Sequence, residues 1–478
     1  MQLTHLTFRP HHQNQNPMKN KIAGLTFLLI SVCSFAQKPT FEIKYSEQLA
    51  VFVFIQNLSE NYPDNVFKTE FVKSRYNTQQ FKDLISNFDK LPIDFSYEFD
   101  GFPYGSKIPM QTRDILKKNL IETENLKDFT LRSVGILTNK TLKELTGILS
   151  QFTPIYNELI YNPNKQAFEN KVRDMIQYAN ENRIEEYFET GLVFYNSSWD
   201  NAIPFKIAFY PLPNSEGFTA QAFYNDFISA VQVDLEDYKG LFSVMLHEIY
   251  HILYNEQSLE VKTELDKNFK ENPSKSANYA YQLLNEALAT ALANGFVYEK
   301  LDGKVDPEDW YNRKYINLMA KQVYPLVTDY VSKKKPIDKN FVDAYISAYE
   351  THFPNWTNEL DNIMTYRYVI SENAADFDII DRKYRYRSTA DYETEITDAG
   401  TAKMKTTTLT KVIIISKSSK EKLNLVKRAF NELKNWKYNP EQEFAYHTLL
   451  NDGSRLIVMN QKDSDLEAMF KKLEAQMK

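Results

Sequence analysis

The sequence predicts an α+β protein that is mostly helical. Between residues 41 and 190, apolar residues recur at three- and four-residue spacing, which is typical of amphipathic helices. Strand-like runs rich in β-branched and aromatic residues follow between residues 205 and 233, and strand and helix patterns alternate near the C-terminus. A chain of 478 residues is long enough for one large domain and one or two smaller units.

Composition and charge narrow the classes of function. Hydrophobic residues make up 43% of the chain and charged residues 25%, as in ordinary globular proteins. A formal net charge of -6 gives no broad positive field, so the sequence favours neither a nucleic-acid partner nor an anionic membrane surface. We expect no transmembrane segment in the mature chain, because no run reaches the roughly 20 apolar residues that such a helix needs.

The N-terminal region has the pattern of an export signal. The basic residues Lys19 and Lys21 precede an apolar run that ends at Cys33. The small residue Ala36 stands where a signal peptidase cuts. We predict a signal peptide over 18–36, a doubtful extension over 1–17, and a periplasmic or extracellular mature protein. Lipid anchoring at Cys33, the only cysteine, is disfavoured because valine precedes it. The mature chain would lack cysteine, which leaves His, Asp and Glu as metal ligands.

The first predicted elements are helices and a small group of strands. Apolar spacing predicts helices over Leu49–Leu58, Leu142–Leu149 and Val172–Tyr187. Phe205–Tyr210 has the pattern of a strand, and the runs Phe218–Tyr224 and Phe227–Val233 flank a turn, which predicts a hairpin.

Three further helices and a compact α/β pattern follow. We expect one helix from Tyr238 through Tyr254, a second that is capped by Ser274 or Ser276 and stops at Asn294-Gly295, and a third between Asp338 and Pro354. The predicted division of the chain is a helical region that is part of the core or a cap to it over 37–200, the core over 201–371, a linker over 372–408, and a small C-terminal α/β accessory module over 409–478.

The most informative residues are His247-Glu248-Ile249-Tyr250-His251 on the first of these helices. Positions four apart lie on one helical face, so both imidazoles can reach a single cation. Glu248 then stands beside the metal, where it can serve as the general base for a zinc-activated water. The neighbouring residues are apolar, and buried histidines need a partner such as a metal. The alternative is two ordinary histidines at helical spacing.

The stretch from Val244 to Leu253 resembles the zincin metallopeptidases, which carry His-Glu-x-x-His among uncharged residues. This resemblance implies a zincin-like domain in which a small sheet lies over the active-site helix. Its edge strand would align the backbone of a peptide or protein substrate, and Zn2+ would be the cofactor. The hairpin predicted just before the helix fits this order.

The third ligand distinguishes the subclasses. The metzincin pattern needs glycine and histidine where this chain has Tyr254 and Gln257, which excludes it. The gluzincin pattern places a glutamate on a separate downstream helix, and Glu286 meets that description within an apolar, alanine-rich run. A surface glutamate on an amphipathic helix is the alternative. Many gluzincins have an aspartate four residues further on, but here the residue is Thr290, so another group must orient the histidine.

A metallopeptidase also needs a donor for the developing oxyanion. Tyr345 and His352 lie downstream of the Glu286 helix, about where gluzincins place such a donor, and we name both as candidates.

The sequence supports an exported, gluzincin-like zinc metallopeptidase that hydrolyses peptide bonds. The main alternative is a non-enzymatic envelope binding protein built on a zincin-like domain, and hydrolysis of a non-peptide amide also stays open. Convergence of His247, His251 and Glu286 beneath an open groove would favour the enzyme.

Overall fold

The computed structural model describes residues 40–213, 217–385 and 389–477. The predicted signal peptide, Cys33 and the extension over 1–17 lie outside the described residues. The fold class is α+β and mostly helical, as predicted. Within the described ranges, no helix combines the length and the apolarity that crossing a membrane requires.

The N-terminal part is helical, as its apolar spacing predicts. The predicted helix Val172–Tyr187 is in fact two helices, because Arg183 between them has a left-handed backbone with φ of 50°. The elements are β1 Phe41–Tyr45, α1 Glu47–Leu58, α2 Val66–Lys73, α3 Gln79–Asp89, β2 Ser96–Tyr97, β3 Met110–Gln111, α4 Thr112–Glu122, α5 Leu126–Arg132, α6 Asn139–Tyr156, the π-helix η1 Asn157–Tyr161, α7 Asn162–Glu181 and α8 Ile184–Phe194.

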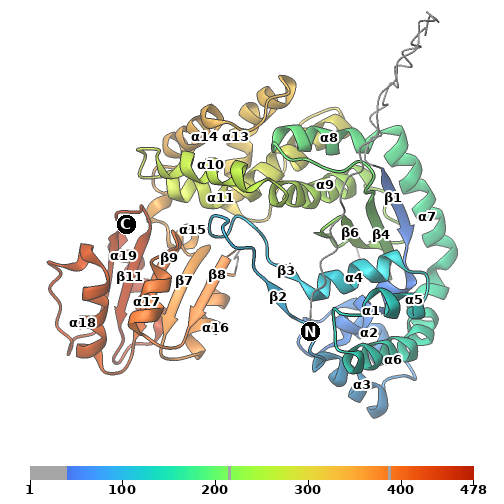
Figure 1. Ribbon diagram of the computed structural model, residues 1–478, viewed down its shortest axis with the longest axis horizontal. Helices are drawn as coiled ribbons and strands as arrows, with labels where there is room; N and C mark the ends of the chain where they lie inside the picture. Colours follow the sequence, from blue (N-terminus) through green and yellow to red (C-terminus); the bar gives the residue numbers. More distant parts are fainter. Residues whose placement is uncertain (1–39, 214–216, 386–388, 478) are drawn as a thin grey trace, which may run out of the picture. The chain divides into compact units, whose positions relative to one another are not determined.

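A four-stranded sheet separates two layers of helices (Figure 1). Its order is β1-β4-β6-β5, in which β1, β4 and β6 are parallel and the edge strand β5 is antiparallel. The predicted hairpin forms as β5 and β6. Alternate residues of a strand face opposite sides, so Ile207 and Phe209 join a core with α8 and α9, whereas Ala208 and Tyr210 join a core with α1 and α6. The remaining bounds are β4 Phe205–Leu212, β5 Gln221–Phe223 and β6 Asp226–Gln232.

A group of helices follows the sheet. Helix α9 begins after Asp237, whose side chain accepts a hydrogen bond from the Gly240 amide. Its end at Asn255 lies one residue beyond the prediction, and a further helix, α10, separates it from α11. The elements are α9 Tyr238–Asn255, α10 Leu259–Lys270, α11 Ala277–Ala289, the π-helix η2 Thr290–Val297, α12 Tyr298–Asp302, α13 Lys314–Ser332, α14 Lys339–His352, the 3-10 helix η3 Trp356–Asn358 and α15 Leu360–Ile363.

The predicted helix end at Asn294-Gly295 is wrong. The chain continues from α11 through the π-helix η2 into α12, which ends at Gly303 in the left-handed region. Gly295 is needed for close packing instead, because a Cβ there would lie 2.8 Å from the ring of Trp310 and 2.9 Å from that of Tyr324.

The C-terminal part forms a five-stranded sheet in the order β10-β11-β9-β7-β8. Residues 372–408, which we expected to be a linker, contain α16, β8 and α17, because buried Ile380, Ile396 and Met404 tie them to the core. The elements are β7 Tyr366–Ser371, α16 Ala375–Lys383, β8 Thr389–Glu393, α17 Asp398–Met404, β9 Thr410–Ile415, α18 Ser419–Ala429, the 3-10 helix η4 Asn431–Leu433, β10 Phe444–Leu449, β11 Arg455–Asn460 and α19 Leu466–Met477.

Candidate metal centre

Helices α9 and α11 bring together His247, His251 and Glu286. The two Nε2 atoms are 3.1 Å apart, and Glu286 Oε2 lies 3.6 Å from His247 Nε2 and 3.4 Å from His251 Nε2. Small alanines on α11 let the two helices pack closely, and the Ser243 hydroxyl of α9 donates to the Ala293 carbonyl of the following π-helix η2. Among the described residues, this is the group of His, Cys, Asp and Glu side chains that could hold a metal ion.

Two asparagines fix the orientation of the imidazoles. His247 Nδ1 lies 3.0 Å from Asn294 Oδ1, and His251 Nδ1 lies 3.0 Å from Asn285 Oδ1. An amide oxygen only accepts hydrogen bonds, so each Nδ1 carries the proton and donates it. The lone pair of each neutral imidazole is therefore on Nε2, the atom that faces Glu286.

Asn294 makes the hydrogen bond to a histidine that Thr290 does not make. Thr290 is buried and its hydroxyl has no hydrogen-bond partner. The π-helix η2 has wider turns than an α-helix, and within it Asn294 faces His247. Sequence reasoning missed this role because we interpreted Asn294 as the end of a helix. Asn285 could have been found, because it directly precedes Glu286 in the sequence.

Glu286 is held as an anion by its two histidine neighbours. Its side chain is 17% exposed, and Oε2 accepts no hydrogen bond of normal geometry. Burial alone would raise its pKa, but His251 and His247 lower it well below its usual range. Burial lowers the pKa of His251, but Glu286 outweighs it and raises that pKa to about 9. The Glu286 carboxylate thus favours positive charge at the histidine pair, at the position that a bound cation would take.

The centre opens into a cleft with a volume of about 420 Å³. Glu248, His251 and Glu286 line it, so the expected general base and two of the three expected metal ligands share one accessible space. Ala222 of the edge strand β5 also lines the cleft. Tyr311 stacks on the ring of His247, with 5.8 Å between the ring centroids.

The two predicted oxyanion donors do not line this cleft. His352 is exposed in the last turn of α14. Tyr345 is fully buried and packs against Phe269 and Phe341 in the core. Our expectation was based on their position in the sequence, but α14 packs behind α10 and α11, away from the cleft lining.

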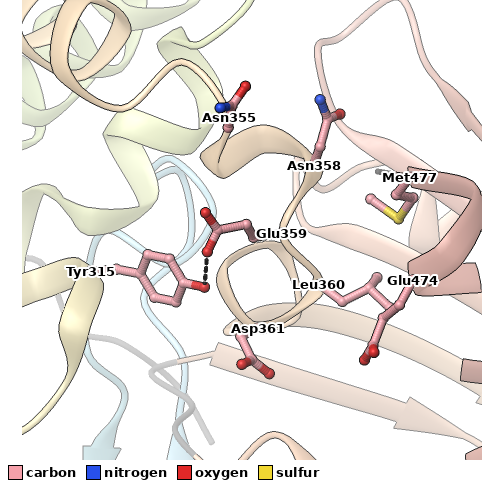
Figure 2. Close-up of a pocket in the computed structure, with 8 residues that line it drawn as sticks. All are labelled: Tyr315, Asn355, Asn358, Glu359, Leu360, Asp361, Glu474 and Met477. Atoms are coloured by element: carbon pink, nitrogen blue, oxygen red, sulfur yellow. Dashed lines mark hydrogen bonds between the residues drawn. The ribbon is translucent and has the colours of Figure 1, made fainter. Parts of the chain in front are cut away.

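A larger cavity lies elsewhere, but it has different chemistry (Figure 2). Its volume is about 510 Å³, and Glu359, Asp361 and Glu474 give it acidic walls. The Tyr315 hydroxyl donates to Glu359 Oε2 over 2.7 Å, which Figure 2 draws as a dashed line. No histidine lines this cavity, so we take the cleft beside α9 as the candidate functional site.

The chain was also compared with known proteins. A scan against protein-family models found no match, and searches of curated proteins and of solved structures found none either. The functional assignment therefore depends on the site itself.

Proposed function

We propose that the protein is an exported, zinc-dependent metallopeptidase of the gluzincin-like type. The observation that carries this proposal is the meeting of His247, His251 and Glu286 around one point, with Glu248 in the adjoining cleft. A helix that presents two histidines, a second helix that presents a glutamate, and a sheet with an antiparallel edge strand together support a zincin-like domain.

The donor atoms suit zinc. Ligand atoms about 2.1 Å from a tetrahedral zinc ion lie roughly 3.4 Å from one another, and the three observed separations are 3.1, 3.4 and 3.6 Å. Two imidazole nitrogens with lone pairs facing each other repel unless a cation or a proton lies between them. Glu286 Oε2 faces the same point without a hydrogen bond, and an unsatisfied buried carboxylate oxygen is costly.

The remaining groups suit peptide hydrolysis. When bound, zinc would supply a Lewis acid that polarises the peptide carbonyl and lowers the pKa of a water molecule. Glu248 would take one proton from the attacking water, whose oxygen bonds to the carbonyl carbon, and would pass that proton to the nitrogen that leaves as the C–N bond breaks. Edge strand β5 can bind an extended substrate by strand addition. Because Glu248 lines an open cleft, the site supports a hydrolase over a protein that only binds a partner.

Substitution of the general base tests this proposal. We expect Glu248→Gln to retain about one zinc ion per chain but to lose peptide cleavage by at least about 100-fold, since a glutamine cannot accept the proton. His247→Ala should lose both zinc and cleavage. Zinc is measured by metal analysis after dialysis, and cleavage with a mixture of quenched fluorescent peptides.

Glu264→Gln on α10 is the matched control, because Glu264 is exposed and does not line the cleft. It should behave like the wild type in both assays. Full cleavage by Glu248→Gln, or a wild-type protein that binds no zinc, would contradict the proposed mechanism.

A further inference from the structure

Residues 95–111 form a hairpin arm with an unusual surface, which we name the strap. Its strands β2 and β3 pair antiparallel near the N-terminal helices, and the connecting loop reaches toward β8 (Figure 1). Several large apolar side chains of the strap are exposed, including Tyr97 at 59%, Tyr104 at 46% and Ile108 at 51%. Exposed apolar groups concentrated on one segment often mark a binding surface.

The strap is anchored on both sides of the cleft. On one side, the Ile108 amide donates to Asn255 Oδ1 over 2.6 Å, and Lys107 Nζ donates to the Asn255 carbonyl over 3.0 Å. On the other side, the Tyr104 hydroxyl donates to Asp391 of β8. Asn255 ends α9 and β8 belongs to the C-terminal sheet, so the strap links the two parts of the chain that border the cleft.

The strap forms a wall of the metal cleft. Tyr104, Ser106 and Ile108 line the same cavity as Glu248 and Glu286. Behind the strap, the buried Lys262 donates from Nζ to the Ser106 carbonyl, which holds the backbone in place. A substrate positioned beside Glu248 would therefore contact Tyr104 and Ile108 and would remove them from water.

The size and the walls of the cleft limit the form of the substrate. A cavity of about 420 Å³ holds a few side chains, as ligand pockets of this size do, and not a folded domain. Ala222 of edge strand β5 and Leu409, which directly precedes β9, line the other walls. An extended segment fits between these walls and the strap, because its backbone can follow β5 while its side chains reach Tyr104 and Ile108.

We infer that the strap is the specificity element of the proposed peptidase: it admits extended polypeptide segments and binds their apolar side chains against Tyr104 and Ile108. This inference rests on the proposed function. Removing an apolar side chain from such a contact lowers kcat/KM by about tenfold or more, so the strap should distinguish peptides that differ at one position.

Paired substrates test the strap in the zinc-loaded, full-length mature protein. The first pair is a quenched ten-residue peptide series in which phenylalanine or serine occupies each position in turn. The second is one disulfide-bonded protein, used folded and then after reduction and alkylation. We expect the wild type to prefer phenylalanine at one or two positions by about tenfold, and to cut only the unfolded form.

Strap variants identify the residues responsible. Ile108→Ser and Tyr104→Ala should each lower the phenylalanine-to-serine ratio of kcat/KM at least about threefold, because they remove apolar contact. Tyr104→Phe keeps the ring but loses the hydroxyl that anchors the strap to Asp391, so its ratio should lie closer to that of the wild type than the ratio of Tyr104→Ala does. Tyr97→Ser is the control, because Tyr97 is equally exposed on the strap but does not line the cleft. Thermal melting verifies that each variant is folded.

The outcomes separate the two proposals. An active wild type whose preference is unchanged by Ile108→Ser and Tyr104→Ala would overturn the role of the strap and leave the peptidase intact. Equal cleavage of the folded and unfolded protein would also overturn it. A zinc-loaded wild type that cuts no peptide would overturn the proposed function, and the strap inference with it.

Discussion

Two asparagines, and not carboxylates, hold the histidines of the candidate centre. The amide oxygens of Asn285 and Asn294 accept the Nδ1 protons and fix the ring orientations without adding negative charge. A carboxylate in the same place would make the imidazole more basic. The total charge of the site therefore comes from Glu286 and Glu248, which face the metal position and the cleft.

Removing one of these acceptors should weaken the metal site. We expect Asn294→Leu to lower zinc affinity by about 10- to 100-fold, because His247 loses the hydrogen bond that holds its Nδ1. Asn294→Asp restores an acceptor and should recover most of that affinity. Competition with a fluorescent zinc chelator gives the dissociation constants. Wild-type affinity in Asn294→Leu would show that the packing of α9 alone orients the ring.

Asp226, which does not line the candidate metal cleft, should make the free energy of unfolding depend on pH. It is fully buried at the start of β6, and neither carboxylate oxygen accepts a hydrogen bond. Burial raises its pKa from 3.8 to about 6, although Lys118 and Lys206 oppose the shift. The folded state therefore binds more protons than the unfolded state between these values. Its contribution to the free energy of unfolding is fully present below pH 3.8 and is lost as pH rises through 6.

Asp226→Asn should remove this loss of stability at high pH. We compare the free energy of unfolding of the variant with that of the wild type at each pH. This difference should favour the variant by about 1–3 kcal/mol more at pH 8 than at pH 4, since one pKa unit corresponds to about 1.4 kcal/mol. Urea denaturation at the two pH values measures the difference. Asp234→Asn, at an exposed position after β6, should show almost none. An equal effect of Asp226→Asn at both pH values would argue against a raised pKa.

At the scale of elements, the position of α9 depends on a glycine in α8. A Cβ at Gly191 would lie 2.5 Å from the ring of Tyr250 and 2.8 Å from Leu253, both fully buried on α9. The Tyr250 hydroxyl donates to the Tyr187 carbonyl over 2.9 Å, which prevents the ring from moving aside. The helix that carries both histidines thus approaches α8 at a distance that only glycine permits.

Gly191→Ala should therefore lower stability by about 1–3 kcal/mol through overpacking. Gly147→Ala is the matched control, because Gly147 also lies within a helix and has no atom within 4 Å of the added methyl group. It should be neutral or stabilising by up to about 1 kcal/mol, given the higher helix propensity of alanine. Thermal and urea unfolding measure the stability of both variants. Equal stabilities would mean that α8 and α9 can separate at little cost.

Local pattern predicts most of the elements but not the details that complete the site. The four-residue spacing of His247 and His251 placed them on one face, and the β-branched and aromatic residues of Phe227–Val233 indicated a strand. The sequence does not indicate the π-helix, because the Asn-Gly pair at 294–295 is also typical of residues that end a helix. Residues 372–408 are polar enough to suggest a linker, yet a few buried residues such as Ile380 are sufficient to fold them.

At the scale of the whole molecule, the C-terminal sheet is not a removable unit beginning at residue 409. Strand β9 lies between β7 and β11, so strands from both sides of that boundary share one sheet. Every residue of β7 and β9 is buried. A cut there would expose the long apolar edge of β7, and such edges promote aggregation.

A chain that ends at residue 408 should be largely insoluble, whereas one that ends at residue 365 removes all five strands together and should be more soluble. Soluble yield and size-exclusion chromatography compare the two. A monomeric product ending at 408, with the melting temperature of the full chain, would contradict the shared sheet.

The pairing of β1 with β4 has a consequence for the order of folding. Phe41–Tyr45 has its hydrogen-bonding partner at Phe205–Leu212, with helices α1 to α8 between them in the sequence. During synthesis, β1 must wait until β4 has emerged from the ribosome, while the intervening helices can already form through local contacts. The sheet whose edge strand β5 borders the cleft is therefore completed late, from segments that are made far apart in time.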